Sequence, residues 1–124
     1  MLIRRRCSWV LFPISDLTGR VVAFGGRILG DGQPKYLNTS ETPIFEKNRI
    51  LFGLFQHKEA IRRTRVAVVV EGNFDLLSLA VHGQDNVVAP LGTALSNSHV
   101  RTLKGYADEV ILLFDGDEAG MKAA

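Results

Sequence analysis

The sequence is poor in cysteine and has no long apolar run, and each absence excludes a class of protein. Its single cysteine, Cys7, cannot form an internal disulfide, and no cysteine–histidine spacing typical of a metal site is present. No segment reaches the roughly 20 apolar residues that a membrane-spanning helix needs. The apolar stretch near the start contains Pro13 and lacks a small-residue cleavage site, which argues against a secretory signal. We therefore expect a cytoplasmic protein with no membrane partner.

Charge is distributed unevenly along the chain, although the net charge is only +2. Residues 1–65 hold 12 of the 15 Lys and Arg residues, whereas residues 66–124 hold eight of the 13 Asp and Glu residues. A basic half beside an acidic half indicates an anionic partner on one side and cations on the other. The hydrophobic content of 46% is enough to bury a core in a chain the size of one domain.

The first half of the chain has the pattern of a β hairpin followed by a loop and a helix. Residues 8–14 and 20–29 are predicted strands, and the segment between them has the Asp and Gly residues of a turn. Gly25 and Gly26 predict a bulge or a close approach of another segment. Residues 30–49 are predicted as loop. Apolar residues at helical spacing predict a helix over 50–63.

The second half alternates apolar runs with helical patterns, which is typical of a doubly wound parallel sheet. Strands are predicted over 66–70, 86–90 and 109–114, and helices over 73–82, 96–104 and from 117 onward. The β-branched run VAVVV is expected to be buried on both faces, as in parallel sheets, and EVILLF is expected to be a buried strand as well. Ser96 has the position and chemistry of a helix N-cap.

Acidic residues follow two of the three predicted parallel strands. Glu71 follows the first strand, and Asp115 and Asp117 follow the third. Ligands of open parallel sheets bind at the carboxyl ends of the strands, so neighbouring strands would bring these acids together. Gly72 and Gly116 leave room there for a sharp turn and a hydrated ion.

Three carboxylates at one sheet edge repel each other, and a bound divalent cation would remove that cost. Oxygen ligands suit Mg²⁺, or Mn²⁺ in its place, and such an ion would assist phosphoryl chemistry. Glu71 could serve there as a metal ligand or as a general base. An alternative remains open at this point: Glu71 and Asp117 could be solvated caps of the helices that follow them.

The sequence around these acids resembles a known family. VVVEGNFD and LLFDGDEAG resemble the two acidic motifs of a Toprim domain. FPISDLTGRVVAFGGRIL, PKYLNTSETPIFEKNRILFGL and APLGTAL resemble the catalytic core of bacterial DNA primase, in order and in spacing, over roughly residues 11–124. The resemblance implies a parallel Toprim-type sheet flanked by helices, preceded by a small antiparallel β hairpin and helix. Residues 1–64 would be the C-terminal part of the basic N-terminal subdomain, and residues 65–124 the N-terminal part of the Toprim domain.

The resemblance also implies an activity: synthesis of short RNA primers on single-stranded DNA by metal-assisted nucleotidyl transfer. Its expected partners are the DNA template, ribonucleoside triphosphates and the RNA–DNA hybrid. The family's metal-binding acids match Glu71, Asp115 and Asp117, and Asp75 matches a further catalytic aspartate. The residues that match its nucleotide and template groove are Arg27, Lys35, Tyr36, Asn38 and Lys47. Tyr36 could stack on a base or pack in the core, and the basic residues could simply be solvated.

The chain departs from the family pattern by what it lacks. It has no counterpart of the family's further acidic motif. It also has no counterpart of the zinc-binding domain that precedes the family's core, where zinc would bind, or of the helicase-binding domain that follows it. We therefore expect a fragment that is marginally stable and does not make primers alone. Two alternatives remain: another Toprim enzyme, such as a nuclease or topoisomerase, or a non-catalytic nucleic-acid-binding remnant. A topoisomerase needs a nucleophilic tyrosine, and we expect neither Tyr36 nor Tyr106 near the acids.

Overall fold

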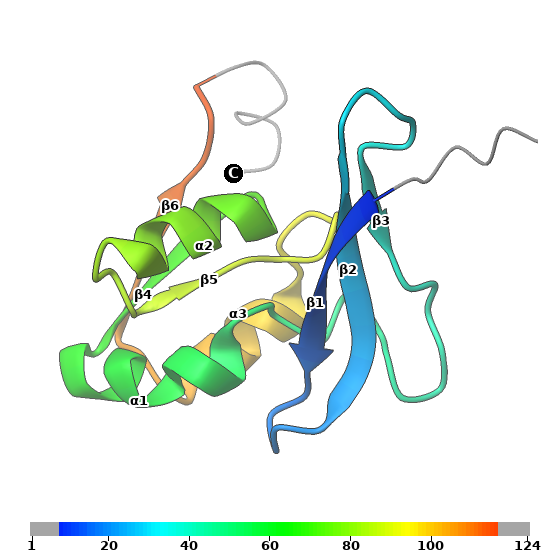
Figure 1. Ribbon diagram of the computed structural model, residues 1–124. Coiled ribbons are helices and arrows are strands. Elements are labelled where there is room, and N and C mark those ends of the chain that lie inside the picture. Colours follow the sequence, from blue (N-terminus) through cyan, green and yellow to red (C-terminus); the bar gives the residue numbers. More distant parts are fainter. Residues whose placement is uncertain (1–7, 117–124) are drawn as a thin grey trace, which may run out of the picture.

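The computed structural model describes residues 8–116, in which an antiparallel sheet stands beside an α/β unit (Figure 1). The antiparallel sheet has the order β1-β2-β3. Its strands are β1 (Ser8–Ser15), β2 (Val21–Leu29) and β3 (Tyr36–Asn38). The predicted hairpin is confirmed by the antiparallel pairing of β1 with β2. The sequence prediction missed β3, because this short strand is defined by its pairing with β2 and not by a local pattern.

Asp16 holds the turn between β1 and β2. Its Oδ1 atom accepts hydrogen bonds from the backbone N–H groups of Thr18 (2.9 Å) and Arg20 (3.0 Å). Gly19 has a φ of 88°, which the turn requires and which glycine adopts without steric cost. The hydrogen bond from the Thr18 hydroxyl is the main reason why the pKa of Asp16 is lowered to about 2. The predicted turn is therefore confirmed.

Gly25 and Gly26 are a place of close approach and not a bulge. The β1–β2 register runs without interruption past both residues and shifts only between Ile14 and Ser15. A Cβ atom at Gly25 would lie 2.1 Å from the ring of Phe12 on the paired strand. The missing side chain thus leaves the space that the Phe12 ring occupies next to Gly25.

The α/β unit contains a parallel sheet of order β5-β4-β6. Its elements are α1 (Leu54–Thr64), β4 (Val66–Val70), α2 (Asn73–Val81), β5 (Val87–Val88), α3 (Asn97–Lys104) and β6 (Glu109–Leu113). The chain leaves β4 toward one side for β5 and returns to the other side for β6. Strand order therefore reverses at β4, which is the position where such sheets bind ligands.

β4 is buried on both faces, as its β-branched sequence predicts. Ala67 and Val69 pack with residues of α1 and α3, whereas Val70 packs with residues of α2 and of the antiparallel sheet. Figure 1 shows the same layers, with α2 on one face of the sheet and α1 and α3 on the other.

The third parallel strand differs from its prediction. We expected a buried strand, but within residues 8–116 β6 is an edge strand of the sheet and most of its residues are exposed. Ile111, Leu112 and Leu113 are all exposed large apolar residues. The strand prediction is confirmed and the burial prediction is wrong, since burial depends on which segments cover an edge.

The first helix begins four residues later than predicted, at Leu54. Gly53 precedes it with a φ of 84°, and the backbone of Phe52 pairs with that of Ala89 in an antiparallel bridge. Leu51 is buried, yet it lies outside the helix. The apolar spacing from Ile50 therefore reflects burial in a loop and not helical periodicity.

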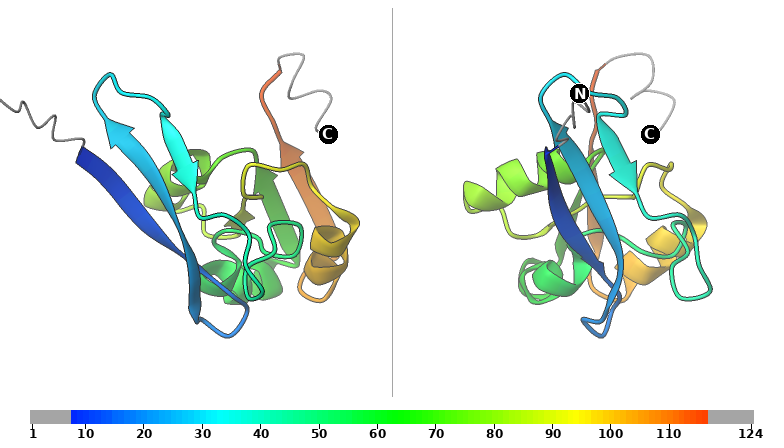
Figure 2. Two further views of the ribbon diagram at one scale, coloured as in Figure 1. Left: turned by 90° about the vertical axis from the view of Figure 1, so that its right-hand side faces the viewer. Right: turned by 45° about the vertical axis from the view of Figure 1, so that its right-hand side comes forward.

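The antiparallel sheet and the α/β unit share one apolar core. Phe12, Ile14 and Ala23 from the hairpin pack with Val70 and Leu76 of the α/β unit. The left view of Figure 2 shows the two sheets side by side, and the segment after β3 leads across to α1. Within residues 8–116, no helix has the length and apolar character needed to cross a membrane.

Candidate active site at the carboxyl ends of the parallel strands

Glu71 and Asp115 lie next to each other at the carboxyl edge of the parallel sheet. β4 and β6 are hydrogen-bonded neighbours, with Val70 opposite Leu113. The backbone N–H of Asp115 donates to Oε2 of Glu71 over 3.4 Å. The predicted neighbourhood of the first and third parallel strands is therefore confirmed.

Asp75 holds the turn that follows Glu71. Its Oδ2 atom accepts a hydrogen bond from the backbone N–H of Gly72 over 3.1 Å, across the first turn of α2. A carboxylate at this place satisfies a backbone donor that the helix leaves free and lies at the positive end of the helix dipole. The helix cap anticipated at Glu71 is thus made by Asp75, and Glu71 stays available for a ligand.

The donor chemistry of this edge fits a hard divalent cation. Glu71, Asp75 and Asp115 take part in none of the ion pairs within residues 8–116, so no cation of that part of the chain offsets their charge. Carboxylate oxygens are the ligands that Mg²⁺ and Mn²⁺ prefer. The third predicted ligand, Asp117, lies outside the described residues. Within those residues, no group of three metal-binding side chains is complete.

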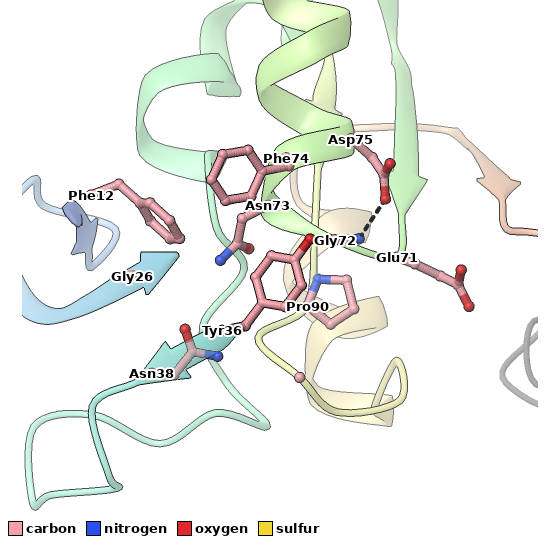
Figure 3. A pocket seen from close by; sticks show the side chains of 11 residues that line it. Phe12, Gly26, Tyr36, Asn38, Glu71, Gly72, Asn73, Phe74, Asp75 and Pro90 are labelled. Atoms are coloured by element: carbon pink, nitrogen blue, oxygen red, sulfur yellow. Dashed lines mark hydrogen bonds between the residues drawn. The ribbon is translucent and has the colours of Figure 1, made fainter. Parts of the chain in front are cut away.

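A pocket of about 320 Å³ opens beside Glu71, between the antiparallel sheet and α2 (Figure 3). Its walls combine aromatic rings, amide groups and the two carboxylates. They are formed by Phe12, Gly26, Tyr36, Asn38, Glu71, Gly72, Asn73, Phe74, Asp75, Pro90 and Gly92. A second hollow of about 270 Å³ lies on the other side of Glu71, with Asp75, Ser78 and Asp115 in its wall. Glu71 and Asp75 therefore border both spaces.

Arg27 and Tyr36 form one stacked group at the first pocket. The Arg27 guanidinium lies 4.7 Å from the ring centre of Tyr36 and 5.6 Å from that of Phe74. Such cation–π contacts stabilise a guanidinium while leaving its N–H groups free to bind an anion. Tyr36 is 56% exposed, so it does not pack in the core, whereas Phe45 is fully buried.

The position of Tyr36 corrects the expectation that no tyrosine lies near the acids. Tyr36 borders the same pocket as Glu71 and Asp75 because β3 brings it across from the antiparallel sheet. The predicted residue Asn38 lines this pocket as well, with its side chain near Gly92. Non-local strand pairing produced this neighbourhood, and no sequence spacing could have shown it.

The structure does not bring Lys35 and Lys47 to either pocket wall. The carbonyl of Lys35 accepts a hydrogen bond from the Ile28 N–H over 3.0 Å, which continues the β2–β3 pairing. The N–H of Lys47 donates to Oε1 of Glu41 over 3.0 Å. Their expected place in a template groove stays a prediction.

Sequence reasoning missed several residues of the pocket. Asn73 and Phe74 were given no role in the sequence analysis, yet both line the wall (Figure 3). Oδ1 of Asn73 is buried without a hydrogen-bond partner within residues 8–116, a cost that is common at functional sites. Pro90 and Gly92 belong to the APLGTAL stretch. The Pro and Gly of this stretch were the sequence signal that could have indicated a place in the pocket.

Two family models match the chain, one for each half. The model described as DNA primase catalytic core, N-terminal domain, matches residues 3–58, and the Toprim domain model matches residues 65–124. The parallel sheet of this chain, with acids at its carboxyl edge, therefore belongs to a domain of the Toprim class.

Relatives identify the particular family. The DNA primase of Pseudomonas putida is 50% identical over 115 residues, which are 93% of this chain and 17% of that relative. The solved structure of the Aquifex aeolicus primase, with zinc-binding and RNA polymerase domains, is 49% identical with a TM-score of 0.85 over 92% of this chain and 28% of that one. A DnaG primase catalytic domain bound to ssDNA is 44% identical with a TM-score of 0.87 over 93% and 37%. The chain belongs to the bacterial DNA primase family, and it spans less than a quarter of the curated relatives it matches.

Proposed function

We propose that this chain supplies part of the nucleotidyl-transfer centre of a DNA primase. The observation that supports the proposal most directly is the meeting of Glu71 and Asp115 beside a pocket lined by Tyr36, on whose ring the Arg27 guanidinium stacks. Acids that can hold a metal, next to a cation and aromatic rings, are what binding and reaction of a nucleoside triphosphate require. In this proposal residues 1–64 and 65–124 are parts of the two subdomains of the primase core.

Mg²⁺ or Mn²⁺ would be held by Glu71 and Asp115, together with Asp117 by resemblance. When bound, the ion neutralises charge on the phosphoryl group and activates the attacking oxygen. Asp75 keeps the turn after Glu71 in place through its hydrogen bond to Gly72. The site therefore has a rigid edge on which the charge of a transferring phosphoryl group can be stabilised.

The remaining predicted residues bind the anionic parts of the substrates. Arg27 offers its free N–H groups to phosphate oxygens, and Tyr36 and Asn38 contact the sugar and base. Lys35 and Lys47 hold the single-stranded DNA backbone, without sequence preference and with a strong dependence on salt. A neighbour in the same family was solved bound to ssDNA, which supports a DNA partner.

The proposed substrates are ribonucleoside triphosphates and a single-stranded DNA template, and the product is an RNA–DNA hybrid. We place the reaction in the cytoplasm, within chromosome replication. The replicative helicase is a further partner in this proposal. The chain alone is expected not to extend primers, because it spans only a small share of its relatives.

Titration calorimetry with Mn²⁺ tests the metal site in the chain as it is. Glu71→Gln and Asp115→Asn each remove one anionic ligand, so each should weaken Mn²⁺ binding at least tenfold. Asp85→Asn is the matched control, because Asp85 is exposed, pairs with Arg63 and lines neither pocket. Unchanged Mn²⁺ binding in the Glu71 and Asp115 variants would contradict the proposal.

A primer-synthesis assay tests the activity. The chain is incubated with single-stranded template, ribonucleotides and Mg²⁺, with a full-length primase as the positive control. We expect no primers from the chain alone. Robust primer formation would show that the shorter chain is sufficient.

A further inference from the structure

His99 lies at the start of α3 and binds a segment that is distant in the sequence. It is fully buried, and it is one of only two buried polar residues within the described part of the chain. Its Nε2 atom lies 2.9 Å from the carbonyl oxygen of Lys47 and 3.1 Å from that of Ile50. Its Nδ1 atom lies 3.1 Å from the backbone nitrogen of Ser96.

The hydrogen-bond partners of His99 determine its tautomer. The backbone nitrogen of Ser96 can only donate, so Nδ1 accepts and carries no proton. The two carbonyl oxygens of Lys47 and Ile50 can only accept, so Nε2 carries the proton. His99 is therefore neutral, and burial, which disfavours the charged imidazolium, lowers its pKa in agreement.

Ser96 adds a third bond between α3 and the same segment. Its hydroxyl donates to the carbonyl oxygen of Asn48 over 2.5 Å and accepts from the backbone N–H of His99 over 3.1 Å. Three carbonyl groups within residues 47–50 are thus held by two side chains at one helix end. We call these contacts the α3 clamp.

Lys47 is the residue that the α3 clamp holds most completely. Its carbonyl oxygen is bound by His99, and its N–H is bound by the carboxylate of Glu41. Both neighbours along the chain, Glu46 and Asn48, are exposed, whereas Lys47 is half-buried. A backbone fixed on both sides gives the lysine side chain a defined origin, which reduces the entropy lost when its ammonium binds an anion.

We propose that His99 is a positioning residue for Lys47: it fixes, from the Toprim half of the chain, the basic segment that contacts the DNA backbone. This inference rests on the proposed template-binding role of Lys47. It assigns a function to a histidine that contacts neither of the two pockets beside Glu71. His99 acts through the backbone of Lys47 and not by touching the substrate.

Two substitutions test the hydrogen bonds of the two imidazole nitrogen atoms of His99 separately. In His99→Gln the amide nitrogen can occupy the place of Nε2 and still donate to the Lys47 carbonyl. In His99→Asn the shorter amide can replace Nδ1 as the acceptor for Ser96, but it does not reach Lys47. Both substitutions disturb the core at the same position, and they differ in the contact under test. Leu103→Val, one turn further along α3 in the same core, controls for destabilisation alone.

Binding of a fluorescently labelled single-stranded oligothymidylate is measured for each variant over a range of salt concentrations, below the onset of unfolding. A lost phosphate contact lowers the slope of log K against log salt by about 0.7 for single strands. We expect this decrease and a several-fold loss of affinity for His99→Asn and for Lys47→Ala. The parent slope should persist in His99→Gln and Leu103→Val. The double variant with His99→Asn and Lys47→Ala should bind like Lys47→Ala alone.

The outcomes distinguish the inference from the proposed function. If Lys47→Ala keeps the parent slope, or the parent chain does not bind, the template-binding role fails and the inference fails with it. If Lys47→Ala lowers the slope but His99→Asn does not, only the inference is overturned. A long-range ¹H–¹⁵N spectrum of the parent chain adds a readout without any variant: a proton on Nδ1 of His99 would contradict the α3 clamp.

Discussion

The two sheets of this molecule contain similar apolar residues but bury them in different ways. In the antiparallel sheet one face packs on the α/β unit, and Phe12 and Ile14 lie on it, while Leu11 and Phe24 remain exposed. In the parallel sheet the central strand β4 is covered on both faces. Apolar content alone therefore does not tell a half-covered strand from a fully covered one.

The sheets also contribute different chemistry to the same pocket. The antiparallel sheet brings the Tyr36 ring, with the Arg27 guanidinium stacked on it, and the α/β unit brings Glu71 and Asp75. Neither of the two regions alone offers both a group that can bind an anion and acids that can bind a metal. The shared core is what holds them together, so substitutions that weaken it should affect both halves.

The largest expected effect comes from the inner face of the antiparallel sheet. Ile14→Ala removes a fully buried side chain from the shared core and should lower the free energy of unfolding by about 2–5 kcal/mol. Leu11→Ala, on the same strand but 66% exposed, should change it by less than about 0.5 kcal/mol. Urea unfolding followed by circular dichroism measures both. Equal losses would mean that the outer face is covered in solution.

The next effect concerns the close approach inside the hairpin. Gly25→Ala places a methyl group 2.1 Å from the Phe12 ring, so the ring must move and the free energy of unfolding should fall by about 1–3 kcal/mol. Gly26→Ala places its methyl group 3.0 Å from the flexible end of Leu11 and 3.3 Å from the Trp9 ring, which are wider contacts, and should cost less. Urea unfolding compares the two variants. A larger cost for Gly26→Ala would show that the strand faces are assigned incorrectly.

A pH dependence should distinguish the α/β unit from the antiparallel sheet. Burial lowers the pKa of His99 below its ordinary value of 6.5, so the unfolded chain binds more protons just below that pH. The contribution of His99 is therefore complete above pH 6.5 and is lost as the pH falls through its lowered pKa. Asp16, with a pKa of about 2, keeps its contribution until the pH falls below 3.8. Unfolding free energies measured from pH 7.5 to 5 should decrease in the parent chain and decrease less in His99→Gln.

The smallest effect is expected at the surface of the α/β unit. Arg65 donates two hydrogen bonds to the carboxylate of Asp108, at 3.0 and 2.6 Å, and both side chains are exposed. These bonds are the main reason why the pKa of Asp108 is lowered. Because water screens such a pair, Asp108→Asn should shift the thermal unfolding midpoint only slightly at pH 7. A shift as large as that of Gly25→Ala would show that the pair contributes to the core.

Local patterns predicted the elements whose signals are complete within a few residues. Ser96 was predicted as the N-cap of α3, and its hydroxyl indeed accepts from the His99 N–H. VAVVV was predicted as a strand buried on both faces, and the turn at Asp16 was predicted from its Asp and Gly. The predicted neighbourhood of Glu71 and Asp115 is also confirmed, because a right-handed α/β alternation leaves few possible strand orders.

The sequence by itself determined the order of the strands and helices other than β3, the two acids at one sheet edge and the family to which the chain belongs. Only the tertiary structure decided the formation of β3, the late start of α1, the exposed edge of β6 and the place of Tyr36 beside Glu71. These features depend on pairing and packing between residues far apart in the chain. Local propensity carries no information about such contacts, because their free energy exists only when both partners are folded.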